Sequence, residues 1–212
     1  MDAKKNEQKS TVVRSTGFAS GAATVKAFAT MAMPPEDAPA ILLQTLVEPL
    51  SSVSDGQVIR DAGIPWLEIF KRIQEDPEFL YGFVGHPRKF EEFLAASYDR
   101  AGYDEVVLTP RSNDGGRDVI AIKKGFASIR ILEQAKAYKP GHLVTHDDVG
   151  ATLSTLLTDT NSSKAIITTT SDFQPRVTKG DRFKHLMPYR LELKNGKQLA
   201  TWISQIAKGD AS

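Results

Sequence analysis

The apolar and polar positions change their period several times along the chain, and each change predicts a separate element. Ile41–Leu50 has apolar residues at helical spacing, and Pro65 fits the first turn of a second helix, WLEIFKRIQ. Between them, residues 51–57 are typical of a linker. Residues 41–86 are therefore expected to form a helical extension. Residues 1–40, rich in Ala, Ser, Thr, Lys and Gly, are expected to be a flexible N-terminal segment.

The pattern becomes more regular in residues 87–212. Residues 87–102, PRKFEEFLAASYDRAG, carry apolar residues at i, i+3 and i+4 between a proline and a glycine, which predicts an amphipathic helix. Further helices are expected at 145–157, 172–185 and 198–207, and strands at 103–108, 119–122, 129–132, 164–170 and 189–193. This order indicates an α/β domain with a mixed central sheet flanked by helices on both faces.

The polar residues around two of these strands form the strongest candidate site. A glycine turn delivers Asp118 to the start of Val119–Ile122, and the next apolar run ends in Glu133, Gln134, Ala135 and Lys136. Because strand side chains alternate, Gln134 and Lys136 are expected on one face and Glu133 on the other. Asp118 and Gln134 offer oxygen ligands to a hard cation such as Mg²⁺, and Lys136 could orient a water or offset phosphate charge.

Each of these polar residues could also have a purely structural role. Paired glycines before an aspartate are a common turn, and each polar residue alone could be a solvated strand end. Occurring together, on strands that are apolar on both faces, they favour a cleft. Glu133 is interpreted as a surface or sheet-edge charge, although it offers a spare carboxylate if the strand register shifts by one. Asp114 is interpreted as a turn former, with contact to the metal as the alternative. A neutral amide at Gln134 predicts weak metal binding without substrate phosphate.

Composition limits the kinds of site and the cellular location that can be expected. The chain has 212 residues, 41% of them hydrophobic, and no cysteine, which excludes disulfides and thiolate metal sites. It contains neither a secretory signal pattern nor an apolar run long enough for a membrane span, so a soluble cytoplasmic protein is expected. Residues 1–85 carry 8 Lys/Arg and 11 Asp/Glu (−3), and residues 86–212 carry 19 and 15 (+4). This asymmetry is compatible with a polyanionic partner and with an ordinary mixed surface.

From Phe90 onward the sequence resembles a known family. The matching pieces are Phe90-Glu91, Ala101-Gly102-Tyr103, Asp114-Gly115-Gly116-Arg117-Asp118, Gln134-Ala135-Lys136 and Thr169-Thr170-Ser171-Asp172-Phe173. In this order and spacing they resemble the catalytic domain of Mrr-like restriction endonucleases, within the PD-(D/E)xK nuclease superfamily. The resemblance covers about half of the chain, and residues 1–85 do not match the winged-helix module that often precedes such domains.

The resemblance implies a restriction-endonuclease-like fold and a role for each matching residue. Asp118 would bind the metal. Gln134 and Lys136 would occupy the positions of the acidic residue and the lysine in the superfamily's acidic-x-Lys motif. Glu91 would complete the metal shell, although the adjacent Glu92 is an alternative. The implied activity is a Mg²⁺-dependent DNA endonuclease, with Mn²⁺ as a possible substitute, in restriction of foreign DNA.

The sequence is compatible with several interpretations of the partners and the function. Lys139, Arg176 and Lys179 are candidate contacts to DNA phosphates, with solvated surface as the alternative. Cutting both strands of a duplex implies a homodimer or larger assembly, and residues 41–86 could bind a protein partner. The alternative functions are a nuclease-fold DNA-binding or complex-assembly module with weak or lost catalysis, and a structure-selective junction endonuclease.

Overall fold

The computed structural model describes residues 39–111 and 116–210, which lie within one compact unit, Met33–Ser212. The strands are β1 (Val47–Val53), β2 (Gly56–Asp61), β3 (Glu105–Leu108), β4 (Val119–Lys123), β5 (Ile129–Lys136), β6 (Leu143–Val144), β7 (Lys164–Thr169), β8 (Asp172–Phe173) and β9 (Leu191–Lys194). The helices are α1 (Ile64–Glu75), α2 (Pro87–Arg100), α3 (His146–Thr158), α4 (Pro175–Lys179) and α5 (Gly196–Lys208), with 3-10 helices η1 (Ala40–Leu43), η2 (Pro77–Phe83) and η3 (Lys184–Leu186). No helix in these described ranges is both long and apolar enough to cross a membrane.

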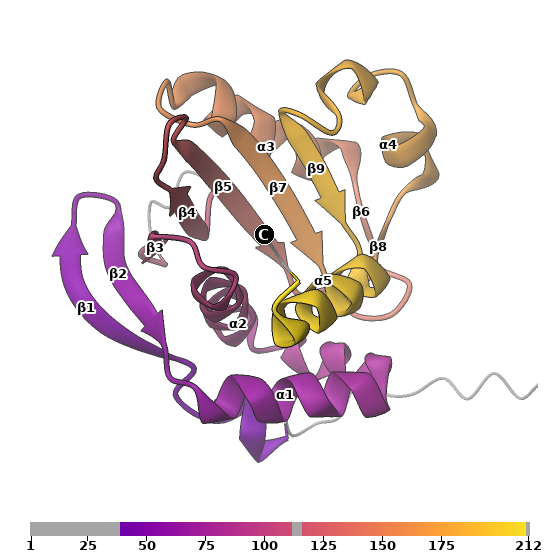
Figure 1. The fold of residues 1–212 in the computed structure, drawn as a ribbon. Coiled ribbons are helices and arrows are strands. Elements are labelled where there is room, and N and C mark those ends of the chain that lie inside the picture. The colour runs from indigo at the N-terminus through magenta and orange to yellow at the C-terminus, as the bar shows by residue number, and fades with distance from the viewer. Residues whose placement is uncertain (1–38, 112–115, 211–212) are drawn as a thin grey trace, which may run out of the picture. The chain divides into compact units, whose positions relative to one another are not determined.

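Seven strands form one sheet in the order β1-β2-β3-β4-β5-β7-β9 (Figure 1). Neighbours from β1 to β5 are antiparallel, whereas β5, β7 and β9 are parallel, so the sheet is mixed as predicted. The parallel strands require crossover connections, which α3 and the segment containing α4 provide. The predicted α/β architecture with a mixed central sheet is therefore confirmed for the described residues.

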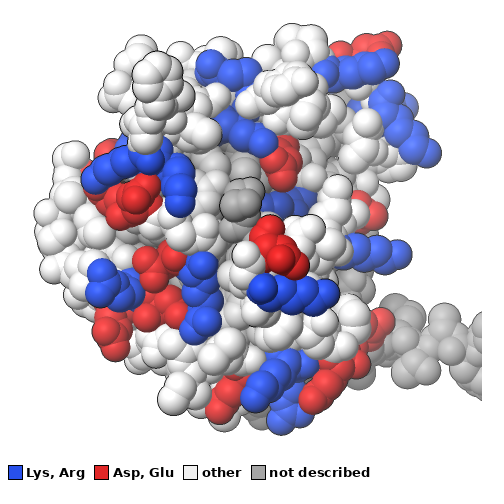
Figure 2. Space-filling view, in the orientation of Figure 1, with Lys and Arg blue, Asp and Glu red and all other residues white. Residues whose placement is uncertain are grey.

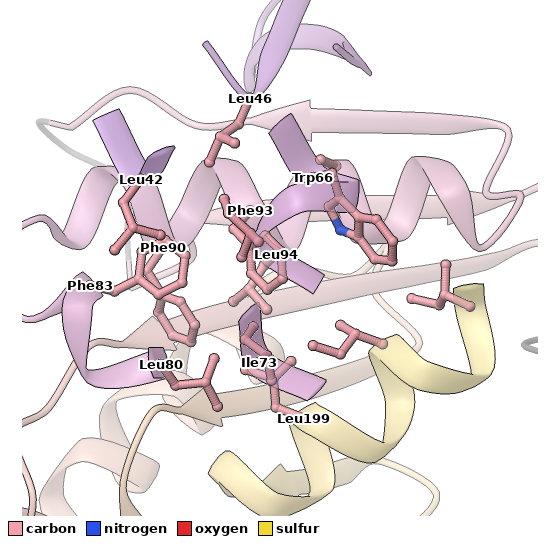
Figure 3. Packing of buried hydrophobic residues seen from close by; sticks show 14 residues of the cluster. Leu42, Leu46, Trp66, Ile73, Leu80, Phe83, Phe90, Phe93, Leu94 and Leu199 are labelled. Atoms are coloured by element: carbon pink, nitrogen blue, oxygen red, sulfur yellow. The ribbon is translucent and has the colours of Figure 1, made fainter. Parts of the chain in front are cut away.

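The two faces of the sheet are covered by different helices. On one face, Val119, Ala121 and Ile131 pack with Ala95 and Tyr98 of α2. A neighbouring cluster on α1, α2, α5, η1 and η2 is built around Trp66, Phe83, Phe90 and Phe93, and Figure 3 shows these side chains gathered together. On the other face, the alternate strand residues Ile120 and Leu132 pack against Leu153 and Leu156 of α3 and Val177 of α4. This alternation decides which strand side chains reach each face.

The helix expected over Ile41–Leu50 is wrong, and residues 51–57 are not a linker. Leu42 and Leu46 are buried, but the chain then enters β1, which forms a hairpin with β2 and extends the sheet beside β3. Pro49 would interrupt a helix, whereas an edge strand such as β1 tolerates proline. Residues 41–86 thus contain most of η1, a hairpin, a helix and the further 3-10 helix η2, and the hairpin belongs to the central sheet.

The single helix expected over residues 172–185 is also wrong. This segment contains β8, the short helix α4 and the start of η3. Pro175 begins α4 because proline fits the first turn of a helix, and Gly180 ends it. The flexible segment predicted for residues 1–40 and the turn role of Asp114 fall largely or wholly outside the described residues.

Glu133 is not a surface charge, because its side chain is completely buried. It lies on the α2 face of β5, where one carboxyl oxygen accepts a 2.6 Å hydrogen bond from the Tyr98 hydroxyl. The other oxygen, Oε1, has no hydrogen-bond partner in the described part of the chain. Burial raises the pKa of Glu133 to about 7, against the opposing effects of the Lys194 charge and the Tyr98 hydrogen bond.

This burial predicts a pH-dependent stability. The folded pKa lies above the ordinary value of 4.5, so the folded state holds a proton that the unfolded chain releases. The free energy of unfolding should fall by on the order of 3 kcal/mol as the pH rises from about 4.5 to above 7. Glu133→Gln should remove this loss, so urea unfolding should show the variant to be more stable than wild type at pH 8 and similar near pH 4.5. Parallel stability curves for the two proteins would contradict the assignment.

Candidate active site

The candidate site is built where β4 begins beside the end of β5. Asp118 directly precedes β4, and Val119 pairs with Glu133 across the antiparallel ladder. The Asp118 amide donates to the Glu133 carbonyl at 2.9 Å, and its carbonyl accepts from the Thr109 amide at 3.0 Å. The backbone of Asp118 is therefore held by both neighbouring strands, and its side chain, only 6% exposed, has a defined position.

The Asp118 carboxylate lies against the end of β5. Its Oδ2 accepts a hydrogen bond from the Ala135 amide at 2.7 Å and another from Nε2 of Gln134. The Gln134 amide oxygen lies beside the turn at Gly116, where an added Cβ would be 3.6 Å from it. Gly116 has a φ of +76°, which favours glycine, so this residue type lets the turn pass close to Gln134.

Lys136 lies on the same face, beside the first turn of α3. Its Nζ is 3.7 Å from Oδ1 of Asp148. The same oxygen accepts from the Tyr138 hydroxyl at 3.2 Å, while Oδ2 accepts from the amide and hydroxyl of Thr145 at 2.9 and 2.8 Å. Thr145 and Asp148 form the capping box of α3, and the Asp148 carboxylate also pairs with Lys136.

These contacts shift the proton affinities of the groups around Lys136. Burial alone would raise the pKa of Asp148, but the Thr145 hydrogen bonds and the Lys136 charge hold it below its usual value. Burial, the Asp148 charge and the hydrogen bond to Asp148 together raise the pKa of Tyr138 to about 12. Asp148 is thus an anion beside Lys136 at neutral pH, and Tyr138 keeps its proton.

Four charged residues tie the β1–β2 hairpin to this region. Arg117, which directly precedes Asp118, pairs with Asp55 at 3.2 Å and with Asp159 at 3.4 Å. Arg130 of β5 pairs with the same two carboxylates at 3.2 and 3.6 Å. Asp55 lies in the turn between β1 and β2, and Asp159 follows the last turn of α3. Two distant parts of the chain therefore pair with the residue next to Asp118, and Arg130 shares their carboxylates.

Glu91, implied by the resemblance, lies in the second turn of α2. One of its carboxylate oxygens accepts from Nη1 of Arg88 at 2.8 Å, and the same Arg88 nitrogen donates to the Thr109 carbonyl at 2.8 Å. Thr109 in turn bonds the backbone of Asp118, so α2 is connected to the site through Arg88. The adjacent Glu92 pairs instead with Lys89 at 2.7 Å.

The three candidate DNA contacts are all exposed. Lys139 lies in the loop that follows β5, three residues beyond Lys136. Arg176 and Lys179 lie on α4, whose Val177 packs into the same apolar cluster as α3. All three therefore belong to the loop or helix on the Asp118 side of the sheet, and their phosphate contacts remain a prediction.

The oxygen donors at the site are of the kind that a hard cation takes. Asp118 offers a carboxylate and Gln134 an amide oxygen, which are ligand types that Mg²⁺ accepts. Within residues 39–111 and 116–210, no group of three or more His, Cys, Asp or Glu side chains is placed to hold a metal. A site of this composition depends on further oxygens from water and substrate phosphate, because Mg²⁺ prefers six oxygen ligands.

Two features of the site could not be read from local sequence. Asp148 is recognisable as a capping residue, but its proximity to Lys136 depends on how α3 packs on the sheet. The ion pairs of Arg117 join residues separated by 62 and 42 positions. The sequence shows that Arg117 precedes the predicted metal ligand Asp118, but it does not show which carboxylates pair with Arg117.

A family model and three solved structures match this chain, and each is described as a restriction endonuclease. The Mrr catalytic-domain model, described as restriction endonuclease, matches residues 85–203. MspJI, solved in complex with a 27-mer oligonucleotide, is 18% identical with a TM-score of 0.44, covering 71% of this chain and 34% of that one. The DNA modification-dependent restriction endonuclease AspBHI is 18% identical with a TM-score of 0.41, covering 68% and 34%. FokI is 11% identical with a TM-score of 0.49, covering 68% and 31%.

This chain therefore spans about a third of the length of each of these three enzymes. No curated protein matches it in sequence. The family match covers more than half of the chain and includes Glu91, Asp118, Gln134 and Lys136. The chain thus belongs to the restriction endonuclease family defined by the Mrr catalytic domain.

Proposed function

We propose that this protein is a metal-dependent DNA endonuclease that hydrolyses phosphodiester bonds, acting in the cytoplasm to restrict foreign DNA. The observation that supports the proposal is the presence of three polar side chains on one face of the sheet. Asp118 and Gln134 are hydrogen bonded to each other, and Lys136 follows Gln134 by two residues on the same strand. Family membership supports the reaction class.

Asp118, Gln134 and Glu91 are the proposed ligands of Mg²⁺, which Mn²⁺ could replace. A bound divalent ion would supply Lewis acidity and lower the pKa of a coordinated water. Asp118 has its carboxylate positioned in advance by the Ala135 amide, so little ordering is required on binding. Gln134 would present its amide oxygen, which faces the Gly116 turn.

Lys136 is the proposed residue for orienting water and offsetting charge on the phosphate. Its ammonium group lies 3.7 Å from Asp148, and alternation along β5 puts Lys136 on the same face as Gln134. A positive charge fixed before substrate binds stabilises developing negative charge without reorganisation during the reaction.

A homodimer or larger assembly is proposed because cleavage of both strands requires two active sites. Residues 41–86 provide a proposed surface for such an assembly or for a protein partner. Within them, β1 is an edge strand of the sheet, and its side chains Leu50 and Val53 are exposed. Exposed edge strands are common sites of association between chains.

One observation favours a second candidate function, a DNA-binding module with weak or lost catalysis. Gln134 occupies the position where the superfamily has an acidic residue, and a neutral amide attracts a cation less than a carboxylate does. The two functions differ in whether DNA is cleaved, so a cleavage assay separates them.

Asp118→Asn should abolish metal-dependent nicking of plasmid DNA, with a loss of on the order of 100-fold or more. Asparagine can still accept the Ala135 hydrogen bond, so the fold should be retained while the negative ligand is lost. The assay compares wild type and variant in Mg²⁺, Mn²⁺ and EDTA. Glu75→Gln on α1, whose side chain is 71% exposed, is the matched control and should cleave like wild type. Equal cleavage in EDTA and Mg²⁺, or by Asp118→Asn and wild type, would refute the proposed enzyme.

Gln134→Glu should strengthen metal binding and can be tested without activity. In EDTA, two carboxylates at this contact repel each other, so the variant should melt at a lower temperature than wild type. Added Mg²⁺ should raise its melting temperature more than that of wild type, because binding to the folded state stabilises it. Differential scanning calorimetry measures both effects. The same Mg²⁺ response in both proteins would exclude residue 134 from the metal site.

A further inference from the structure

A basic cavity lies beside the candidate site, at the start of α2. Its volume is about 440 Å³, and its lining includes His86, Arg88, Lys89, Glu91 and Arg111. Two arginines and a lysine thus face one carboxylate. On the face of the molecule shown in Figure 2, basic and acidic side chains are interspersed over the described residues. In the lining of this cavity, Lys and Arg side chains outnumber carboxylates.

Arg88 is held in place with hydrogen-bonding capacity to spare. Its Nη1 donates to Glu91 and to the Thr109 carbonyl, both at 2.8 Å, and its side chain is 20% exposed. Among the described residues, no hydrogen bond uses its Nε or Nη2 groups. A guanidinium fixed in this way presents its remaining donors in a defined direction, which suits recognition of a phosphate.

The other two cations differ in how firmly they are held. Lys89 Nζ donates to the Gln44 carbonyl at 3.0 Å and pairs with Glu92 at 2.7 Å. Arg111 is exposed and makes no hydrogen bond or ion pair with any described residue. Arg111 can therefore move toward a ligand that the fixed Arg88 has bound.

The position of the cavity points to its ligand. Arg88 donates to the Thr109 carbonyl, and the Thr109 amide donates to the Asp118 carbonyl at 3.0 Å. The cavity therefore flanks the strand end that carries Asp118. The positive end of the α2 dipole adds to its attraction for anions, since Pro87 begins this 14-residue helix.

We propose that this cavity binds a backbone phosphate of DNA next to the one that is cleaved, through Arg88 and Arg111, with Glu91 orienting Arg88. The inference rests on the proposed function, because it takes DNA as the substrate. It adds a phosphate-binding site to the candidates Lys139, Arg176 and Lys179. Contacts of this kind position the duplex and carry no sequence information of their own.

The test is the affinity of the full chain for a short DNA duplex, measured by fluorescence anisotropy in EDTA at several salt concentrations. Arg111→Ala and Arg88→Gln should each raise Kd about tenfold at low salt, for duplexes of any sequence. Each should also reduce the slope of log Kd against log salt by about 1, because one phosphate contact is lost. Arg72→Ala, on α1 with its side chain 65% exposed, is the control and should bind like wild type.

The outcomes separate this proposal from the proposed nuclease function. If wild type binds the duplex and the two arginine variants match it in Kd and slope, the cavity is not a phosphate site, and the nuclease proposal is unaffected. If wild type itself does not bind duplex DNA, the proposed substrate is wrong and the cavity proposal is overturned with it. Arg111 makes no hydrogen bond or ion pair with any described residue, so its variant tests the cavity even if Arg88→Gln is unstable.

Discussion

The antiparallel register between β4 and β5 is the constraint on which the site depends. Pairing of Val119 with Glu133 places Asp118 beside Gln134, and the Asp118 carboxylate then accepts from the Ala135 amide. A shift of one residue would move every side chain of β5 to the opposite face. Glu133 would then face Asp118, and Gln134 would be buried against α2. The apolar residues Ile131 and Leu132, which fill different cores, hold the register that avoids this.

This constraint explains why polar side chains occur on both faces of one short strand. Glu133 is completely buried and accepts a hydrogen bond from the Tyr98 hydroxyl. Gln134 and Lys136 lie on the opposite face, with Asp118. Ion pairs also stabilise the segment that directly precedes β4. Arg117 and Arg130 each pair with Asp55 and Asp159, which lie outside β4 and β5. The β1–β2 hairpin therefore supports the site, although it lies at the far edge of the sheet.

Much of this arrangement could be predicted from sequence because it depends on local periodicity. The amphipathic pattern of 87–102 corresponds to α2, and the two apolar runs around Asp118 correspond to β4 and β5. The β1–β2 hairpin was missed because Ile41–Leu50 has helical spacing, although Asp55-Gly56 is a hairpin-turn signal. The burial of Glu133, the ion pairs of Arg117 and the cavity at Arg88 arise from contacts between distant segments. Local pattern contains no information about such contacts.

The central claim is that the β4–β5 register creates a site for a divalent ion at Asp118 and Gln134. Anomalous scattering from Mn²⁺ in crystals of the protein bound to a DNA duplex measures this directly. The account predicts an anomalous peak within coordination distance of an Asp118 carboxylate oxygen and the Gln134 amide oxygen, next to a DNA phosphate. A Mn²⁺ peak bound by other residues, or DNA bound with no peak at Asp118, would contradict it.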